Sequence, residues 1–181
     1  LYLLKRKKKL GLGSALREGM RYAEKSNYYA LLTLDADLSH NPEEIPLLVK
    51  KSKLNDFVIG SRYVIGGKSD YEGYRDLVSR LANKLCRFFL NMPFNEFTTS
   101  FRIYNHKCLK VLKKASLKSN GYSSQIEFFF YIYKSGLNCN EIPIKFRQRF
   151  KGNSKISRLE VLYSALKLIE LFIKRFFIKK K

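Results

Sequence analysis

Short apolar runs and helix-start signals alternate along the first third of the chain. Residues 28–34 (YYALLTL) and 56–60 (DFVIG) predict two buried strands. Between them, residues 41–44 (NPEE) predict a helix start, because Asn caps the first amides, Pro suits the first turn and acids suit the positive end of a helix. Residues 140–146 (NEIPIKF) predict an edge strand, since Pro143 has no amide to donate. Strand, helix and strand at this spacing are typical of α/β proteins, so we expect a mostly parallel sheet flanked by helices.

Apolar positions three and four residues apart predict the other helices. The first begins near Ser14, a suitable N-cap, and has one apolar face made of Leu16, Met20 and Ala23. Residues 123–134 are rich in aromatic side chains and predict a buried helix. The other expected elements are a helix at 76–91 with an apolar stripe of Leu77, Leu81, Leu85 and Phe88 or Phe89, a strand at 101–104 and a helix at 107–114.

The C-terminal residues 158–181 predict a final helix with a basic end. Leu162, Leu166, Ile169 and Ile173 fall on one face of it. An apolar face beside aromatic and basic residues is typical of a helix that lies in a membrane interface. Packing of the same face on the protein core is the other interpretation. We therefore divide the chain into a main domain, residues 1–157, and this helix.

The charge of the chain narrows the choice of partners. There are 36 Lys and Arg against 15 Asp and Glu, a net charge of +21. This favours nucleic acid, anionic lipid or phosphorylated substrates as partners. The three cysteines form no Cys-X-X-Cys motif, which argues against a disulfide scaffold or a zinc module.

Asp35 and Asp37 follow the first predicted strand directly. Two carboxylates two residues apart on an extended backbone point to the same side, so they can share one divalent cation. Carboxylate oxygens suit Mg²⁺ or Mn²⁺ holding a diphosphate, and ligands of open α/β sheets gather at strand ends. The alternative is a surface loop with two solvated acids.

Seven stretches occur in this order: KKLGLGSA (8–15), DADLSHNP (35–42), GSRY (60–63), SRLANKL (79–85), FTTSFRIYNHKCL (97–109), SSQIEF (123–128) and FRQRFKGNSKIS (146–157). Together they resemble the polyprenol-phosphate glycosyltransferases of glycosyltransferase family 2, to which the dolichol-phosphate mannosyltransferases belong. The resemblance implies a GT-A-like nucleotide-sugar-binding domain over residues 1–157. Family members begin with a strand that ends in a Pro-Thr-Tyr-Asn-Glu-like motif, and none precedes Leu1. We therefore expect an incomplete N-terminus, and the choice between a guanosine and a uridine nucleotide stays open.

The resemblance also implies roles for individual residues. Glu96 stands where relatives often carry Asp, which offers it as a catalytic acid. The implied metal ligands are Asp35, Asp37 and Gln125; the donor-binding residues are Asp35, Asp37, Arg149 and Lys155; the catalytic residues are Asp37, Arg149 and Lys155; and the residues for the acceptor phosphate are Arg62, Arg80, Ser100 and Arg102. Guanidinium groups suit bidentate phosphate binding, and a basic, glycine-containing loop suits closure over the donor phosphates.

The reaction implied is inverting transfer of a hexose, with mannose favoured, from a nucleotide sugar, with GDP-mannose favoured, to polyprenyl or dolichyl phosphate. The second pKa of such a phosphate is about 6 by analogy with phosphorylated side chains, so it is already a nucleophile near neutral pH and needs no strong general base. Catalysis then comes from alignment and from neutralising the departing diphosphate. The implied location is the cytoplasmic face of a membrane, as a peripheral protein at the membrane surface.

Two rival functions fit parts of the sequence. A family 2 transferase with a polysaccharide or another acceptor would share the carboxylate motif. A basic nucleic-acid-binding protein would explain the net charge through phosphate contacts. The sequence has no RNP-type aromatic motif, zinc finger or convincing helix-turn-helix, so we expect no nucleic-acid partner.

Overall fold

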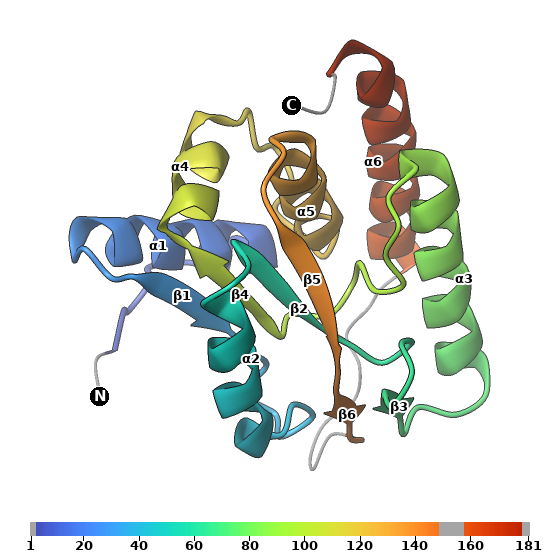
Figure 1. Cartoon of the computed structure of the whole chain (residues 1–181). Coiled ribbons are helices and arrows are strands. Elements are labelled where there is room, and N and C mark those ends of the chain that lie inside the picture. The colour runs from blue at the N-terminus through green and yellow to red at the C-terminus, as the bar shows by residue number, and fades with distance from the viewer. Residues whose placement is uncertain (1–2, 149–157, 179–181) are drawn as a thin grey trace.

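A four-stranded sheet forms the middle of the structure (Figure 1). The computed structural model describes residues 3–148 and 158–178. The strands are β1 (Ala30–Thr33), β2 (Phe57–Ser61), β4 (Arg102–Asn105) and β5 (Cys139–Pro143), in the spatial order β1-β4-β2-β5. β4 pairs antiparallel with both β1 and β2, whereas β2 and β5 are parallel. Three strands therefore share one direction, and β4 opposes them.

The expected α/β class is confirmed, and the sheet is mixed at β4. After β2 the chain forms α3 (Tyr74–Leu90) and then runs back to the end of the sheet at which β2 finishes (Figure 1). The next strand has to enter the sheet from that end, which reverses its direction. β5 lies at an edge of the sheet, as predicted, with Pro143 as its last residue.

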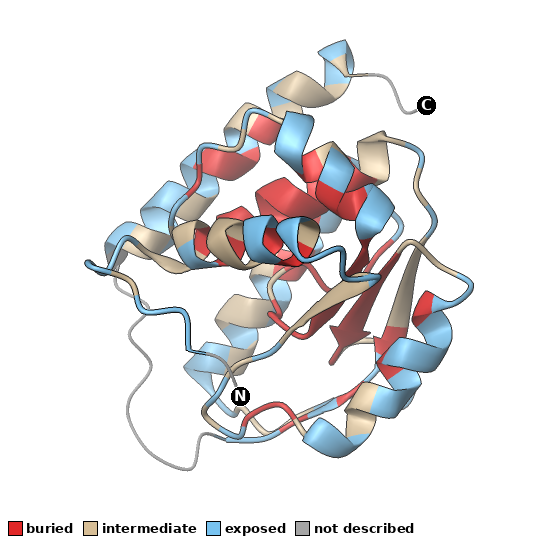
Figure 2. Cartoon of the chain, turned by 90° about the vertical axis from the view of Figure 1, so that its left-hand side faces the viewer, coloured by how far each residue is buried: buried red, intermediate tan, exposed pale blue. Residues whose placement is uncertain are grey.

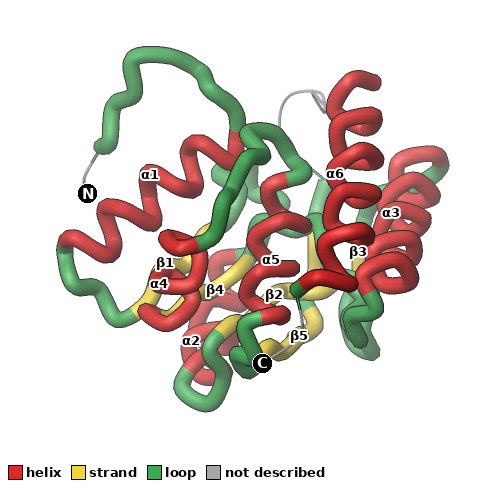
Figure 3. Tube along the Cα trace, turned by 90° about the horizontal axis from the view of Figure 1, so that it is seen from above, coloured by secondary structure: helices red, strands yellow, loops and turns green. Residues whose placement is uncertain are grey.

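Side chains of the central strand β2 alternate between two cores. Phe57 and Ile59 belong to the larger core, and Val58 belongs to the smaller one. The larger core is covered by α1 (Leu12–Lys25), α4 (His106–Lys114) and α5 (Ser124–Lys134), and the smaller by α2 (Ile45–Ser52). Figure 2 shows the inner strands β2 and β4 and the interior helix α5 as the most buried parts, whereas β1 is of intermediate burial. In the view from above, α1, α5, α6 and α3 follow one another across the molecule (Figure 3).

Two helix starts were predicted from the sequence, and one of them is shifted. Asn41 caps a 3-10 turn, η1 (Pro42–Glu44), and its side chain accepts a hydrogen bond from the Glu43 amide, as expected. The prediction that Ser14 caps the first helix is wrong, because α1 starts at Leu12 with Gly11 as its N-cap. Gly11 has φ +86°, a left-handed conformation that glycine adopts without strain. Ser14 lies inside the helix and accepts a hydrogen bond from Arg6.

The expected buried faces of α1 and α5 are confirmed. Leu16, Met20 and Ala23 are buried on α1. On α5, all residues from 124 to 130 are buried, so this aromatic helix lies inside the protein. A further pair of short strands, β3 (Lys68–Ser69) and β6 (Lys145–Phe146), lies beside the end of β5.

The last helix, α6 (Arg158–Phe177), lies beside α3 (Figure 1). It packs on the body through Leu168, Leu171 and the buried Lys167, whose ammonium lies 3.1 Å from the Glu127 carboxylate on α5. The predicted apolar face of α6 is on the opposite side, and its four residues are exposed. The predicted stripe of α3 also faces outward, since Leu77 is 65% and Leu81 53% exposed. The division of the chain at residue 157 stays a prediction.

Candidate active site

The predicted site residues that the structure describes gather at one end of the sheet. β1 and β2 finish there, and because β4 is antiparallel, the segment that precedes β4 returns to the same end. Three pieces of chain therefore meet: residues 34–40 after β1, residues 61–63 at the end of β2, and residues 95–101 before β4. The N-terminus of α5, with Gln125, contacts the third piece.

The loop that carries Asp35 and Asp37 is held by its own neighbours. The Asp35 amide donates to Nδ1 of His40 at 2.9 Å. Oδ1 of Asp37 accepts from the amide and the hydroxyl of Ser39, at 3.1 and 2.5 Å. Leu38 has φ +64°, a left-handed conformation that is costly for a branched residue, so the loop is sharply turned between Asp37 and Ser39. Both aspartates keep part of their surface exposed.

His40 is almost completely buried, at 1% exposure, in the same loop. Its Nε2 lies 3.1 Å from Oγ1 of Thr99. Burial lowers the pKa of His40 below its usual value, and the Asp35 carboxylate opposes this shift without cancelling it. We therefore describe the imidazole as neutral. The sequence predicted no role for His40 or Ser39, although both lie in the DADLSH motif, residues 35–40.

Gln125 is fully buried at the start of α5. Its Nε2 donates to Oγ of Ser100 at 3.1 Å, and the Ser100 carbonyl accepts from the Thr33 hydroxyl at 2.6 Å, two residues before Asp35. Within residues 3–148 and 158–178, no group forms a hydrogen bond with Oε1 of Gln125, although that oxygen is buried. An amide oxygen without a partner is what a third ligand beside two carboxylates would leave before a cation binds.

These observations fit a divalent cation bound by oxygen atoms. Two carboxylates and one amide oxygen are hard donors, which suit Mg²⁺ or Mn²⁺. No group of three His, Cys, Asp or Glu side chains in the described part of the chain could hold a metal ion, so a site here needs the amide of Gln125 or groups from elsewhere.

Arg62, at the end of β2, forms a buried ion pair with Glu96. Its Nε and Nη2 donate to the two carboxylate oxygens at 2.7 and 2.9 Å, and Nη2 also donates to Thr98. Burial alone would raise the pKa of Glu96, but the charge and hydrogen bonds of Arg62 outweigh it and hold the pKa below its usual value. Glu96 is thus an ionised partner of Arg62, which does not favour a role as proton donor.

The four residues expected at the acceptor phosphate differ in exposure. The Arg80 side chain is 53% exposed on α3 and pairs with Asp76 at 2.6 Å. Its guanidinium lies 5.0 Å from the ring centroid of Tyr63, and that of Arg62 lies 4.9 Å from the same centroid. Tyr63 therefore connects the end of β2 to α3, and its hydroxyl donates to Ser79.

Arg102 is fully buried, and its three bonds go to backbone carbonyls. It donates to Thr99, Gln125 and Phe97 at 2.8, 2.7 and 2.6 Å. Burial lowers the pKa of Arg102. These bonds join the segment before β4 to the start of α5. Arg102 therefore holds the backbone of the site in place. Arg149 and Lys155 lie outside the described residues.

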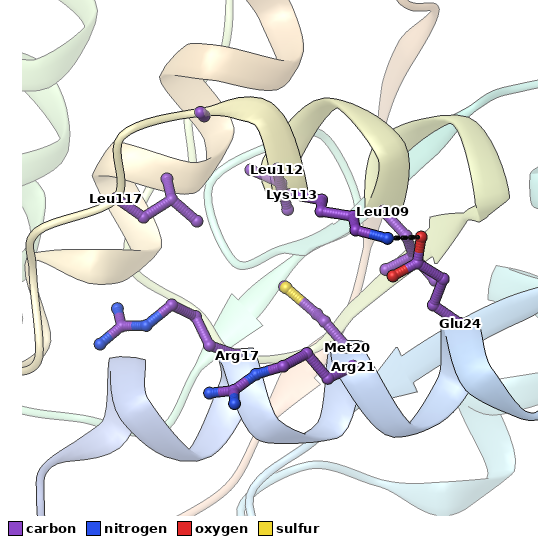
Figure 4. Close-up of a pocket in the computed structure, with 9 residues that line it drawn as sticks. Arg17, Met20, Arg21, Glu24, Leu109, Leu112, Lys113 and Leu117 are labelled. Atoms are coloured by element: carbon purple, nitrogen blue, oxygen red, sulfur yellow. Dashed lines mark hydrogen bonds and ion pairs between the residues drawn. The ribbon is translucent and has the colours of Figure 1, made fainter.

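A separate pocket of about 210 Å³ lies between α1 and α4 (Figure 4). Apolar and charged side chains both line it: Met20 of α1 points toward α4, and the Lys113–Glu24 ion pair at 2.9 Å closes one side. None of the predicted site residues lines it. The pocket therefore adds nothing to the candidate site at the strand ends.

Comparison with known proteins identifies the family. Residues 1–112 match glycosyl transferase family 2, and the chain belongs to this family. An undecaprenyl-phosphate mannosyltransferase from Micrococcus luteus is 34% identical over 158 residues, covering 87% of this chain and 65% of that protein. A polyprenol monophosphomannose synthase from Mycolicibacterium smegmatis is 33% identical over 172 residues, covering 94% of this chain and 65% of that protein. The chain thus spans 65% of the length of these two curated relatives.

Solved structures agree on the fold. The glucosyl-3-phosphoglycerate synthase of Mycobacterium tuberculosis, in complex with Mn²⁺, UDP-glucose and phosphoglyceric acid, superimposes with a TM-score of 0.60 at 17% identity, covering 90% of this chain and 55% of that chain. The same enzyme with UDP gives a TM-score of 0.54. The chain therefore has the GT-A fold of nucleotide-sugar-dependent glycosyltransferases.

Proposed function

We propose that this protein transfers a hexose, with mannose favoured, from a nucleotide sugar to a polyprenyl phosphate, with inversion at the sugar carbon. The observation that supports this best is the pair Asp35 and Asp37 after β1 together with the buried Oε1 of Gln125, which has no partner among the described residues. Ser100 connects the two sides, because it accepts hydrogen bonds from Thr33 of β1 and from Nε2 of Gln125. The names of the relatives favour mannose and a polyprenyl acceptor. GDP-mannose is the donor that we favour.

Asp35, Asp37 and Gln125 would hold Mg²⁺ or Mn²⁺. When bound, the cation supplies positive charge that stabilises the departing diphosphate. The solved neighbour with Mn²⁺ and UDP-glucose shows that this fold accommodates such a pair in that protein. Asp37 is in our proposal both ligand and catalytic residue, and Arg149 and Lys155 bind the donor phosphates and assist departure.

Arg80 is the residue best suited to meet the phosphate of the acceptor. It is exposed on α3, next to Tyr63, and carries a guanidinium fork that matches phosphate oxygens. Arg62, Ser100 and Arg102 are buried, with partners inside the protein. We propose that these three act on the acceptor side through the shape of the segment before β4. The acceptor phosphate is its own nucleophile, so the site needs no strong base.

The outward faces of α3 and α6 support a membrane surface as partner. Leu166 and Ile169 of α6 are 54% and 57% exposed, and Leu77 and Leu81 of the neighbouring α3 are exposed as well. The side of α6 that faces the body carries the ionic contacts of Lys167 with Glu127 and Glu170. A helix whose outward face is apolar, with Leu162, Leu166, Ile169 and Ile173 exposed, suits the interface of a bilayer, where basic residues add roughly 1 kcal/mol each near anionic lipid.

We propose that the protein lies on the membrane through this surface, as a peripheral protein. In the part of the chain that the structure describes, no helix has the length and apolar character needed to span a bilayer. The cytoplasmic face belongs to the proposal through the family resemblance alone.

A transfer assay tests the function. The protein is incubated with Mn²⁺ and radiolabelled GDP-mannose, UDP-glucose or UDP-galactose, with either a short polyprenyl phosphate or 3-phosphoglycerate as acceptor. We expect label from GDP-mannose in the organic phase, only with the lipid acceptor. Label in the aqueous 3-phosphoglycerate product instead would favour a family 2 transferase with another acceptor, and lipid product from a uridine sugar would correct the donor.

A further inference from the structure

His40 joins the two halves of the candidate metal site. Its Nδ1 accepts from the amide of Asp35 at 2.9 Å, in the loop after β1. Its Nε2 lies 3.1 Å from the Thr99 hydroxyl, in the segment before β4. The next residue, Ser100, accepts from the amide of Gln125. One imidazole therefore connects the carboxylate loop to the segment that holds the third proposed ligand.

The hydrogen bonds fix the tautomer of this imidazole. A backbone amide can only donate, so Nδ1 has to be the nitrogen without a proton. Nε2 then carries the proton and donates to Oγ1 of Thr99. With the other tautomer, or with a charged ring, a proton on Nδ1 would face the N–H of Asp35. The Asp35 amide would then have no acceptor in this partly buried place. The geometry at Asp35 alone thus requires a neutral ring protonated at Nε2.

The ring of His40 is also held in place from its sides. Its centroid lies 5.0 Å from that of Phe101 and 5.1 Å from that of Phe146. The backbones of His40 and Phe146 pair as an isolated bridge, and the Arg147 amide donates to Ser39. A ring fixed in this way holds the Asp35 backbone at one distance from Thr99.

We propose that His40 is a positioning residue for the divalent cation. As a neutral ring protonated at Nε2, it sets the separation between the Asp35–Asp37 loop and the Gln125 side of the site. This role rests on the metal site of the proposed function. Groups that orient metal ligands from outside typically change metal affinity by 10–100-fold when they are replaced.

Two substitutions each remove one of the two hydrogen bonds made by the ring. In His40→Asn the amide oxygen takes about the place of Nδ1 and still accepts from Asp35, whereas in His40→Gln the amide group reaches the place of Nε2 and leaves Asp35 without an acceptor. Both variants lose the packed ring, so we expect similar decreases in melting temperature. His106→Gln, at the other histidine, which is exposed on α4, is the control.

Affinity for Mn²⁺, measured from the free-ion signal in electron paramagnetic resonance, is the readout. We expect a loss of about 10-fold or more for both His40 variants, because each breaks one of the two hydrogen bonds through which the ring connects Asp35 to Thr99, and a value close to wild type for His106→Gln. Wild-type affinity in either His40 variant, or an equal loss in His106→Gln, would overturn the role of His40. Wild-type protein that binds no Mn²⁺ would overturn the metal site itself, and the role of His40 with it.

The tautomer is tested without any metal. Long-range ¹H–¹⁵N spectra of protein with labelled histidine distinguish a protonated from a bare ring nitrogen, and His106→Gln assigns the signals. We expect His40 to be protonated at Nε2 only, and Thr99→Val, which removes the acceptor of that proton, to weaken this preference. A proton on Nδ1 in the wild type would overturn the proposal whatever the metal does.

Discussion

Arg62 and Glu96 form a bidentate ion pair that is buried at the end of the sheet, with contacts of 2.7 and 2.9 Å. The pair ties the end of β2 to the segment before β4. The Glu96 carboxylate also accepts from the amides of Thr98 and Thr99, which brings Thr99 into place for His40. Glu96, which the sequence offered as a catalytic acid, therefore holds in place the segment before β4, which carries Thr99 and Ser100.

Removing the charge of Glu96 should be costly, because it leaves Arg62 buried without compensation. We expect Glu96→Gln to lower the free energy of unfolding by about 3 kcal/mol, measured by urea denaturation. Arg80→Gln, which removes one partner of the exposed Arg80–Asp76 pair, is the control and should cost less than about 1 kcal/mol. An equal cost for the two variants would contradict the structural role of the buried pair.

Charges placed on the outward stripes should weaken membrane binding without unfolding the protein. We expect the double variant Leu81→Glu, Ile169→Glu to bind anionic vesicles at least about tenfold more weakly, since the burial of one such side chain contributes about 1.5 kcal/mol or more. Its melting temperature should stay near that of the wild type, because both residues are more than half exposed. Co-sedimentation and circular dichroism measure the two quantities.

The matched control places the same charges on another face. Leu54 and Val49 are exposed apolar residues at α2 and the turn that follows it. The double variant Leu54→Glu, Val49→Glu has the same net charge as the first but leaves the exposed residues of α3 and α6 unchanged. Its vesicle binding should therefore exceed that of the first variant. Equal binding by the two variants would show that net charge, and not the α3–α6 surface, governs attachment.

Acid should remove a stabilising contribution of α6, the contacts of Glu170 with Lys167 and Lys174. Hydrogen bonds from Lys167 and Lys174 hold the pKa of Glu170 at about 2, compared with an ordinary value of 4.5. Between these values the folded carboxylate stays ionised while the unfolded one takes up a proton, so the contribution to stability is present above about pH 4.5 and is lost as the pH falls toward 2. Because the Glu170 side chain is 36% exposed, screening reduces this contribution to about 1 kcal/mol.

The variant Glu170→Gln isolates this effect. Between pH 5 and pH 2, we expect the melting temperature of the wild type to fall further than that of the variant, with the extra fall reaching about 2–4 °C. Parallel curves for the two proteins would mean that the contacts of Glu170 contribute nothing to the stability of α6.

The proposed roles of Arg80 and Arg149 predict different kinetic defects. Arg80→Lys keeps the charge but loses the guanidinium fork, so it should raise KM for the lipid phosphate by more than KM for the donor. Arg149→Ala should instead lower turnover with the donor. Steady-state kinetics with each substrate varied in turn measures both, and one shared pattern of defects would refute this division of roles.

The sequence predicts the parts of the site that depend on local pattern. The apolar run before Asp35 predicted β1, and Asn41 and Pro42 predicted the turn into α2. The burial of Arg62 and Arg102 was not predictable in this way, because it depends on partners such as Glu96, which lies 34 residues further along the chain from Arg62. His40 was missed for the same reason, since its contact with Thr99 spans 59 residues.

The helix stripes show another limit of pattern analysis. Periodicity shows that Leu77 and Leu81 share a face of α3, but not which face meets the core. Asn83, Cys86 and Leu90 form the buried face instead, where Asn83 accepts from the Phe97 amide. A residue that looks polar in the sequence can thus be buried when a backbone group from a distant segment bonds to it.

The central claim is that Asp35 and Asp37 bind a divalent cation together with the diphosphate of the donor. Isothermal titration calorimetry with GDP, in the presence and absence of Mn²⁺, measures this most directly. We predict that GDP binds the wild type with Mn²⁺, that omitting the metal weakens binding strongly, and that Asp35→Asn and Asp37→Asn each remove the metal dependence while leaving the circular dichroism spectrum unchanged. Metal-dependent affinity that is the same in wild type and both variants would contradict the account.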